Sequence, residues 1–373
     1  MEEKSIKIIH IISSLEKGGA QGLLLEIIQN LDKPNYQHLI ISLKAGNAYE
    51  AITQAQNINI LSMNLTTLNL LKSLKDILRV INQFKPNIIQ SWMYHADFLT
   101  IILKPFLNNL KIIWSFHHAH PGKNKKRSIF LAKLCSKFSN IIPFCIIACS
   151  NITKKEHIEF GYSEKKILVI NNGVDEKRFK YNPRIHLPKE QPVIGFIGRW
   201  HQIKGHETFI KAAKILNENI DAPKFIMIGS NLDNSNHDLL KIIESHGLCE
   251  NIELFGEEEV DIRKYYEMMD IYICSSWSES FSLTIVESAL QGIPIVSTDV
   301  GIIRDITDND RLINKVGDSE GIAKSVMKLI DYEADVIEAQ LRNSFENAYG
   351  MFSLNRMLNE YEAIYNQCLI EKK

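Results

Sequence analysis

Cysteine, long apolar runs and targeting signals are scarce or absent in this sequence, and each absence excludes a class of protein. The six cysteines include no CxxC pair, and Cys145 and Cys149 have no second pair or histidine cluster with which to hold a metal. The longest apolar stretch, residues 140–150, is too short to cross a bilayer. The first residues are acidic and do not resemble a signal peptide. We therefore expect a cytoplasmic protein with reduced, structural thiols.

The overall composition is that of an ordinary globular protein. Hydrophobic residues make up 45% and charged residues 23%, which excludes disordered, collagen-like and coiled-coil chains. At roughly 100 to 200 residues per domain, a chain of 373 residues predicts about two domains, each able to bury its own core. We expect a cleft between them.

The near-neutral total charge hides a strong asymmetry between the two halves. Residues 1–188 hold 25 Lys and Arg against 13 Asp and Glu, whereas the remainder holds 18 against 31. A basic first half suggests an anionic partner. Nucleic acid is disfavoured, because zinc-finger spacing, an RRM signature and a Gly/Arg tract are all missing and the second half is acidic. An anionic membrane or phospholipid fits the charge as well.

Short β-branched runs alternate with helical patterns, which predicts α/β domains with doubly wound parallel sheets. A polar stretch with Pro183 and Pro188 interrupts this rhythm, and we place the linker at residues 181–191. The domains are then residues 1–180 and 192–350, followed by an amphipathic helix within 351–373. The predicted strands are 6–13, 38–43, 58–63, 88–91, 111–116, 146–150, 193–198, 224–229, 252–255, 271–275 and 293–297.

Ligands bind at the carboxyl ends of such strands, so the loops there carry the candidate residues. After the first strand, Gly18 and Gly19 precede a helix and would let a backbone approach a phosphate, although a simple tight turn explains them too. No GxGxxG dinucleotide fingerprint is present. After a later strand, His117, His118 and His120 suit acid–base work or hydrogen bonding to a sugar, with a buried structural histidine as the alternative.

The second half opens with a strand followed by Gly198, Arg199, Lys204 and Gly205. A guanidinium fork and an ammonium together suit a diphosphate leaving group, and a solvated basic pair is the alternative.

Two acids, Glu279 and Glu287, stand eight residues apart around a helix predicted at residues 280–290. Helix capping alone would explain Glu279. Glu287 lies among apolar residues, where a carboxylate needs polar partners such as ribose hydroxyls. Small residues at Ser280 and Ser282 would leave the first helical amides open to an anion.

These motifs resemble those of the family 4 glycosyltransferases, retaining enzymes of GT-B fold that act in bacterial glycan assembly. The similar segments are Gly18 to Gln21, Asn172 to Asp175 with Phe179, the pair Gly198-Arg199 with Lys204-Gly205, and the E-x7-E segment Glu279 to Glu287. The resemblance implies two facing Rossmann-like domains with a deep cleft: an acceptor-binding first domain, a nucleotide-sugar-binding second domain and a last helix that returns to the first.

The resemblance also implies roles for individual residues. Arg199 and Lys204 would bind the donor diphosphate and stabilise the leaving nucleotide without a divalent metal or other cofactor. Glu279 would contact the donor sugar, Glu287 the ribose, and His117 the reacting sugar. The remaining donor contacts would come from Gly18, Gly19, Gly198 and the backbone around Phe281, Ser282 and Leu283. The family often has glycines where this chain has Ser280 and Ser282, which leaves amide access there open.

The implied reaction is transfer of a sugar, with retention, from a nucleotide diphosphate to a saccharide or lipid-linked saccharide in surface polysaccharide, lipopolysaccharide or glycoprotein glycan assembly. UDP-sugar is the default donor and GDP-sugar the other choice. Two alternatives stay open: a sugar-nucleotide 2-epimerase, and a non-catalytic partner subunit that binds a nucleotide sugar.

The basic run from Gly122 to Arg127 is followed by an amphipathic stretch at residues 129–138. Such a segment suits peripheral contact with the inner face of an anionic cytoplasmic membrane, and a solvated helix face is the alternative.

Overall fold

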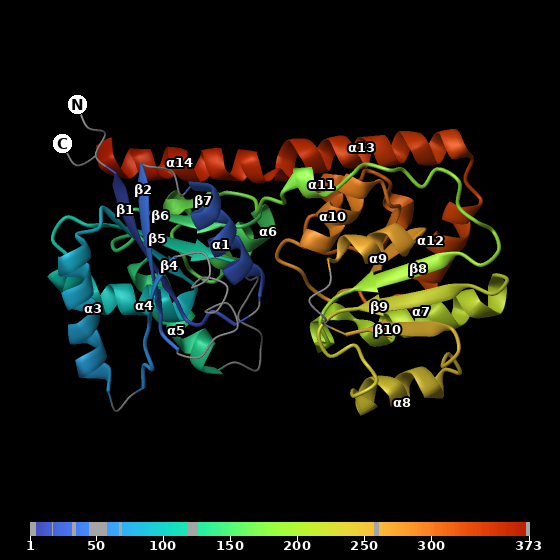
Figure 1. The fold of residues 1–373 in the computed structure, drawn as a ribbon, viewed down its shortest axis with the longest axis horizontal. Coiled ribbons are helices and arrows are strands. Elements are labelled where there is room, and N and C mark those ends of the chain that lie inside the picture. Colours follow the sequence, from blue (N-terminus) through green and yellow to red (C-terminus); the bar gives the residue numbers. More distant parts are fainter. Residues whose placement is uncertain are drawn as a thin grey trace. The chain divides into compact units, whose positions relative to one another are not determined.

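The computed structural model describes residues 5–16, 18–31, 35–44, 58–66, 69–117, 126–256 and 261–370. The chain divides into two compact units. The first unit comprises Met1–Gly173 together with Asn355–Lys373, and the second unit comprises Val174–Leu354. Each unit is an α/β domain built on its own parallel sheet, as the alternating sequence pattern predicts (Figure 1).

In the described residues, the first unit holds a seven-stranded parallel sheet in the order β3-β2-β1-β4-β5-β6-β7. Its strands are β1 (Ile6–Ile12), β2 (Tyr36–Ser42), β3 (Asn59–Ser62), β4 (Ile88–Trp92), β5 (Lys111–Phe116), β6 (Cys145–Ala148) and β7 (Ile167–Val169). Helices α1 (Gly19–Leu31), α3 (Leu70–Phe84), α4 (Tyr94–Leu103), α5 (Lys126–Phe138) and α6 (Asn151–Glu159) connect them. The inner strands are buried on both faces, which is why they read as continuous apolar runs.

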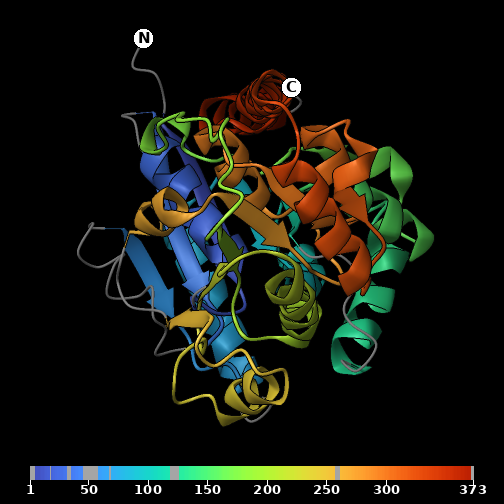
Figure 2. The same ribbon diagram turned by 90° about the vertical axis from the view of Figure 1, so that its right-hand side faces the viewer.

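The second unit repeats the plan with six described strands in the order β10-β9-β8-β11-β12-β13. They are β8 (Val193–Ile197), β9 (Lys224–Ile228), β10 (Ile252–Phe255), β11 (Ile271–Cys274), β12 (Ile295–Thr298) and β13 (Ile313–Asn314). Its helices are α7 (His206–Asn219), α8 (His237–Ser245), α9 (Arg263–Met268), α10 (Leu283–Gln291), α11 (Ile303–Ile306), α12 (Ser319–Ile330) and α13 (Ala334–Phe352). Figure 2 faces this unit, with α8 beside the β10 edge of the sheet.

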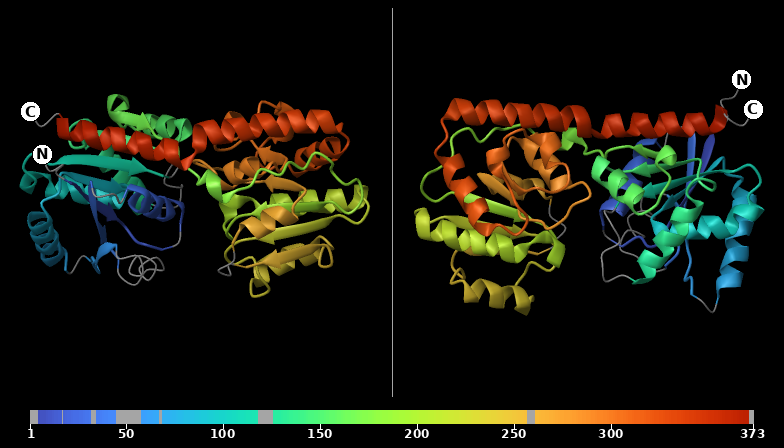
Figure 3. Two further views of the ribbon diagram at one scale, coloured as in Figure 1. Left: turned by 45° about the horizontal axis from the view of Figure 1, so that its top comes forward. Right: turned by 180° about the vertical axis from the view of Figure 1, so that it is seen from behind.

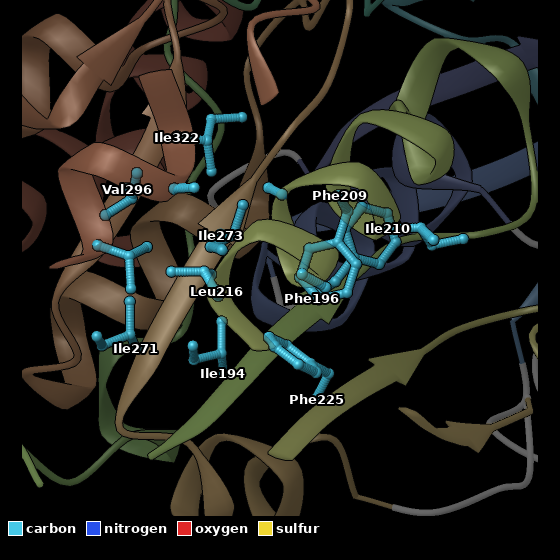
Figure 4. Packing of buried hydrophobic residues seen from close by; sticks show 14 of the residues in the cluster. Ile194, Phe196, Phe209, Ile210, Leu216, Phe225, Ile271, Ile273, Val296 and Ile322 are labelled. Atoms are coloured by element: carbon cyan, nitrogen blue, oxygen red, sulfur yellow. The ribbon is translucent and has the colours of Figure 1, made fainter. Parts of the chain in front are cut away.

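An apolar core holds the second unit's helices against its sheet. Phe196 of β8, Phe209 of α7 and Phe225 of β9 pack together, with ring centroids 5.3 Å apart for the first two and 6.3 Å for the last two. Ile273 and Val296 continue this cluster across β11 and β12 (Figure 4). The core fixes the strand ends from which the loops start.

Each sheet has one place where the strand order reverses. In the first sheet it lies between β1 and β4, and in the second between β8 and β11. Open α/β sheets bind ligands outside the carboxyl ends of their strands at this switch point. The loops after β8 and β11 and those after β1 and β4 are therefore the places that topology favours.

The last helix, α14 (Leu354–Ile370), belongs to the first unit (Figure 3). It lies over a face of the sheet that carries polar side chains. The Tyr365 hydroxyl donates to Gln90 Oε1 over 2.5 Å, and the Tyr36 hydroxyl donates to Glu362 Oε1 over 3.2 Å. The Gly173 N–H donates to Met357 Sδ over 3.0 Å.

The boundaries between the two units differ from the domain boundaries that we expected. Residues 174–180, which we assigned to the first domain, group with the second unit, as do linker residues 181–191. The linker packs on that unit because the Asn182 N–H donates to the Gln291 carbonyl over 3.1 Å and the Gln191 N–H to the Asp221 carbonyl over 2.8 Å. Strands β7 and β13 were not predicted.

Candidate active site

The loop after β8 is shaped by glycines. The Gly198 N–H extends the β8–β9 ladder by donating to the Ile228 carbonyl over 2.9 Å. At the far end of the loop, Gly205 has a φ of 70°, and a Cβ there would lie 2.0 Å from the Ser275 carbonyl oxygen. Only glycine allows both this φ and this approach. The loop is thereby pressed against the segment that follows β11, which brings Lys204 close to that segment.

Lys204 and Glu279 form an ion pair, with 2.7 Å between Nζ and Oε1. The Ser276 hydroxyl donates to the same carboxylate oxygen over 2.7 Å. The two side chains are only 22% and 12% exposed, so solvent screens the pair less than it screens a surface salt bridge. The structure therefore joins two predicted residues that are 75 positions apart in the chain.

Arg199 differs from Lys204 in being exposed. Its guanidinium makes no ion pair or side-chain hydrogen bond with any residue that the structure describes. An unpaired fork of N–H donors near a paired lysine is an arrangement that can receive a diphosphate.

Helix α10 begins later than the sequence pattern predicts. It starts at Leu283 rather than at residue 280, because Ser282 has a φ of 84° and cannot continue a right-handed helix. Glu279 thus lies in the loop before the helix and is not its cap. The Ser282 side chain does not cap the helix, so the first helical amides, at the positive end of the dipole, lack that partner. The Phe281 ring lies 5.2 Å from that of Phe352, and the Phe281 carbonyl accepts from the Ile302 N–H over 3.2 Å.

Glu287 has a partner that sequence reasoning missed. The hydroxyl of the fully buried Tyr266 donates to Glu287 Oε2 over 2.7 Å. Burial raises the pKa of the Glu287 carboxyl, while this hydrogen bond and the nearby Arg178 charge act in the opposite direction. Glu287 contacts Tyr266 rather than the Lys204–Glu279 pair.

In the first unit, α1 starts at Gly19 directly after the loop that follows β1. Among the described residues, a Cβ added to Gly19 would meet no atom within 4 Å apart from its chain neighbours and its own helix. A Cβ on Gly18 would lie 2.6 Å from Gln21 Oε1, and the Gln21 amide in turn donates to the Ser14 carbonyl over 3.2 Å. Lys17 lies outside the described residues. Within the described part of the chain, the space beside Gly19 is thus unfilled.

His117 directly follows β5 and is 7% exposed. Its imidazole stacks on the Trp92 indole, with centroids 4.9 Å apart and planes at 18°. Its Nδ1 lies 3.3 Å from Asn172 Oδ1, which gives the Asn-Gly-Val-Asp segment a contact that its sequence did not indicate. His118 and His120 fall outside the described residues, so His117 is the one that the structure places.

Among the described residues, no group of three or more His, Cys, Asp and Glu side chains is arranged to hold a metal ion. Within the same residues, no helix is both long enough and apolar enough to cross a membrane.

Two family models match consecutive parts of the chain. The model described as Glycosyltransferase Family 4 matches residues 17–178, and the one described as Glycosyl transferases group 1 matches residues 177–349. A solved structure of Anabaena HepE, in complex with UDP and glucose, superimposes with a TM-score of 0.81 at 19% identity, covering 97% of this chain and all of that one. The chain belongs to the GT-B glycosyltransferases. The predicted fold class and the family resemblance are thus confirmed.

One of two similar curated proteins is itself named a glycosyltransferase. The capsular polysaccharide biosynthesis glycosyltransferase CapM of Staphylococcus aureus is 23% identical, with 99% of each chain covered. An uncharacterized 41.2 kDa protein in the cps region of Klebsiella pneumoniae is 27% identical, and the match spans 65% of each chain.

Proposed function

We propose that this glycosyltransferase moves a sugar, with retention of anomeric configuration, from a nucleotide diphosphate to a saccharide or lipid-linked saccharide acceptor in the assembly of bacterial surface polysaccharide, lipopolysaccharide or glycoprotein glycans. UDP-sugar is the donor we favour. The observation that carries the proposal is the Lys204–Glu279 pair beside the unpaired Arg199. The Anabaena neighbour that binds UDP and glucose, and the capsular polysaccharide relative, support the choice of donor and pathway class.

Lys204 would stabilise the departing diphosphate while it stays paired with Glu279. An ammonium has three N–H donors, and Glu279 takes one of them, so the others remain for phosphate oxygens. The carboxylate thereby orients the cation before the donor arrives, in addition to contacting the donor sugar. Charge that develops on the diphosphate as the glycosidic bond breaks would then meet a cation already in place, which is the usual source of large catalytic effects.

The other donor contacts follow from the same loops. Arg199 would bind phosphate oxygens with its planar fork, the uncapped amides at Leu283 would face an anionic oxygen, and Glu287 would accept hydrogen bonds from the ribose hydroxyls. The anomeric carbon–oxygen bond of the donor breaks, the acceptor oxygen attacks from the same face, and the leaving phosphate takes the acceptor's proton. No divalent metal or resident cofactor enters this proposal. His117 would lie beside the reacting sugar.

The donor site is tested by thermal unfolding of the purified chain with UDP, GDP, ADP and their sugars, each with and without EDTA. A ligand at a hundred times its Kd adds about 2.7 kcal/mol to the unfolding free energy. We expect a shift that one nucleotide produces, that EDTA leaves unchanged, and that Arg199→Ala and Glu287→Ala abolish. Arg342→Ala, which removes an exposed arginine paired with Glu338, is the matched control and should keep the shift.

Product analysis separates transfer from its alternatives. NMR of the product should show a new glycosidic bond with the donor's anomeric configuration. An inverted product would overturn the retaining mechanism. Epimerised donor in the absence of acceptor would identify an epimerase, and nucleotide-sugar binding without turnover across an acceptor panel would identify a binding subunit.

We also propose that the first unit contacts an anionic membrane surface, because a lipid-linked acceptor would be held in a membrane. A pocket of about 610 Å³ at the amino ends of β5, β6 and β7 is lined by Lys104, Lys111, Lys165 and Lys166. None of Lys104, Lys165 and Lys166 forms an ion pair with a described residue. Ile141 in the same lining is 73% exposed. Cations beside exposed apolar side chains suit an anionic lipid interface.

The amphipathic segment predicted at residues 129–138 lies within α5, where Phe130 is 65% exposed and Phe138 is 36% exposed. Flotation with phosphatidylglycerol vesicles should carry the wild-type chain upward and phosphatidylcholine vesicles should not. A Lys104→Gln, Lys165→Gln, Lys166→Gln variant should lose binding, whereas Lys211→Gln in the second unit should keep it. Equal flotation of the triple variant and the wild type would contradict the proposal.

A further inference from the structure

Five aromatic rings contact one another in a row across the first unit's sheet. They belong to Tyr36, His38, His10, Trp92 and His117, and each of these residues is at most 7% exposed. Successive centroids lie 6.1, 5.3, 6.1 and 4.9 Å apart. Parallel sheets are usually lined by aliphatic side chains on both faces, so buried imidazoles here need hydrogen-bond partners. The row ends at His117, which the proposed function places beside the reacting sugar.

The hydrogen bonds within the row are directional. The Trp92 indole N–H can only donate, and it lies 3.4 Å from His10 Nδ1. That nitrogen must therefore accept, which places the His10 proton on Nε2. His10 Nε2 lies 3.0 Å from His38 Nδ1 and donates to it. Desolvation and the neighbouring His38 keep the pKa of His10 well below its ordinary value, so the imidazole is neutral and its tautomer is set by these two partners.

Side chains of three residues contact His117. The Trp92 indole covers its face, Asn172 Oδ1 lies 3.3 Å from its Nδ1, and its backbone N–H donates to Met93 Sδ over 3.4 Å. Met93 has a φ of 73°, an uncommon conformation for a residue with a side chain, directly after Trp92. The end of β4 is thus shaped so that two consecutive residues contact His117.

We infer that Trp92, oriented by its hydrogen bond to His10, is a positioning residue that fixes the imidazole plane of His117. This inference rests on the proposed function for its effect on turnover, since Trp92 itself is buried and acts through His117. The contact between the two rings is a property of the first unit alone. Donor binding, which the proposed function assigns mainly to the second unit, should therefore be unaffected.

The test compares two chemically identical substitutions, Trp92→Phe and Trp114→Phe. Both tryptophans are fully buried, and each indole N–H makes one side-chain hydrogen bond, to His10 Nδ1 for Trp92 and to Thr100 Oγ1 at 2.9 Å for Trp114. Only Trp92 stacks on His117. A misplacement of about 1 Å at a reacting group can cost on the order of a hundredfold in rate. We expect Trp92→Phe to lower kcat at least tenfold and to change the donor KM by no more than about twofold. Trp114→Phe should leave kcat and KM unchanged when rates are referred to the concentration of folded protein.

A second pair of variants tests the part played by His10. His10→Asn places an amide oxygen near the position of Nδ1 and can still accept from the indole, whereas His10→Leu cannot. We expect the asparagine variant to retain more of kcat than the leucine variant. Equal losses in the two would remove His10 from the inference.

NMR of the His117 ring provides a readout that does not need turnover. With histidine-labelled protein, and the signal assigned by loss in His117→Gln, Trp92→Phe should shift the His117 ring resonances and Trp114→Phe should not. If the resonances shift but no donor is turned over by the wild type, the proposed function fails and the positioning contact stands. If Trp92→Phe leaves both the resonances and kcat as in the wild type, or if Trp114→Phe changes them equally, the inference is overturned.

Discussion

Replacing Lys204 with glutamine should separate the catalytic use of its charge from its contribution to stability. The Lys204–Glu279 pair, with 2.7 Å between charged atoms and side chains 22% and 12% exposed, lies between an exposed salt bridge and a fully buried one. Exposed pairs contribute about 0 to 1 kcal/mol, and breaking a buried pair costs about 3 to 5 kcal/mol. We therefore expect Lys204→Gln to lower the unfolding free energy by about 1 to 2 kcal/mol, with the fold retained. Loss of one preorganised charge at a leaving group should lower kcat by about 10² to 10³.

The chain offers a matched control for this substitution. Lys211 Nζ also lies 2.7 Å from a carboxylate, Glu207 Oε1, but the two side chains are 49% and 61% exposed on the surface of α7. Lys211→Gln should cost about 0.3 to 0.5 kcal/mol, as such helical pairs do, and should leave kcat unchanged. Urea unfolding and steady-state kinetics on both variants measure the difference. A folded Lys204→Gln variant with kcat within threefold of the control would refute the role of this charge.

Three further substitutions, one of them with a control, probe the loops and helix of the second unit. Gly205→Ala should lower the unfolding free energy by more than about 2 kcal/mol, because its Cβ would collide with the Ser275 carbonyl. The control, Gly247→Ala, has the same φ of 70° but no neighbour within 4 Å among the described residues, and should cost about 1 kcal/mol. Thermal unfolding of the two variants measures the difference. Ser282→Gly should raise the melting temperature slightly and keep activity, since glycine accepts a φ of 84° without strain. Burial raises the pKa of Glu287, so the folded protein binds this proton more tightly than the unfolded chain does. The unfolding free energy should therefore fall as pH rises from about 4.5 through the folded pKa. Urea titrations at a series of pH values should show that Glu287→Gln removes this pH dependence.

The architecture could be predicted where strands are long and buried. The runs that became β1, β5 and β8 are β-branched and buried on both faces, so their apolar character stands out against the polar loops. Strands β7 and β13 have three and two residues, too few for any periodicity to show. Residues 174–191 group with the second unit because hydrogen bonds join them to residues distant in the sequence, such as Gln291 and Phe352, and a polar stretch looks the same in the sequence whether or not it has such partners.

The site residues could be named from the sequence, but their partners could not. Loop positions followed from strand ends, which is why Lys204 and Glu279 were both candidates before their contact was known. Tyr266 stands 21 positions before Glu287, in a different helix, and reaches it only because of the sheet order. The predicted start of α10 was wrong because the periodicity of apolar residues does not reveal the positive φ at Ser282.

The Asn172-Gly173-Val174-Asp175 segment illustrates why a motif's role becomes legible only with its contacts. Its first residue faces His117 in the first unit, and the Gly173 N–H donates to Met357 of α14. From Val174 the chain belongs to the second unit, where the Val174 N–H donates to the Phe352 carbonyl and its own carbonyl accepts from the Leu354 N–H. The chain crosses between the units after Gly173 and after Leu354, and backbone hydrogen bonds hold both crossings in place. The first crossing comes just after Asn172, which contacts His117. Asn172 and Gly173 therefore make their contacts within the protein, at the His117 imidazole and at Met357 respectively, and neither side chain is charged.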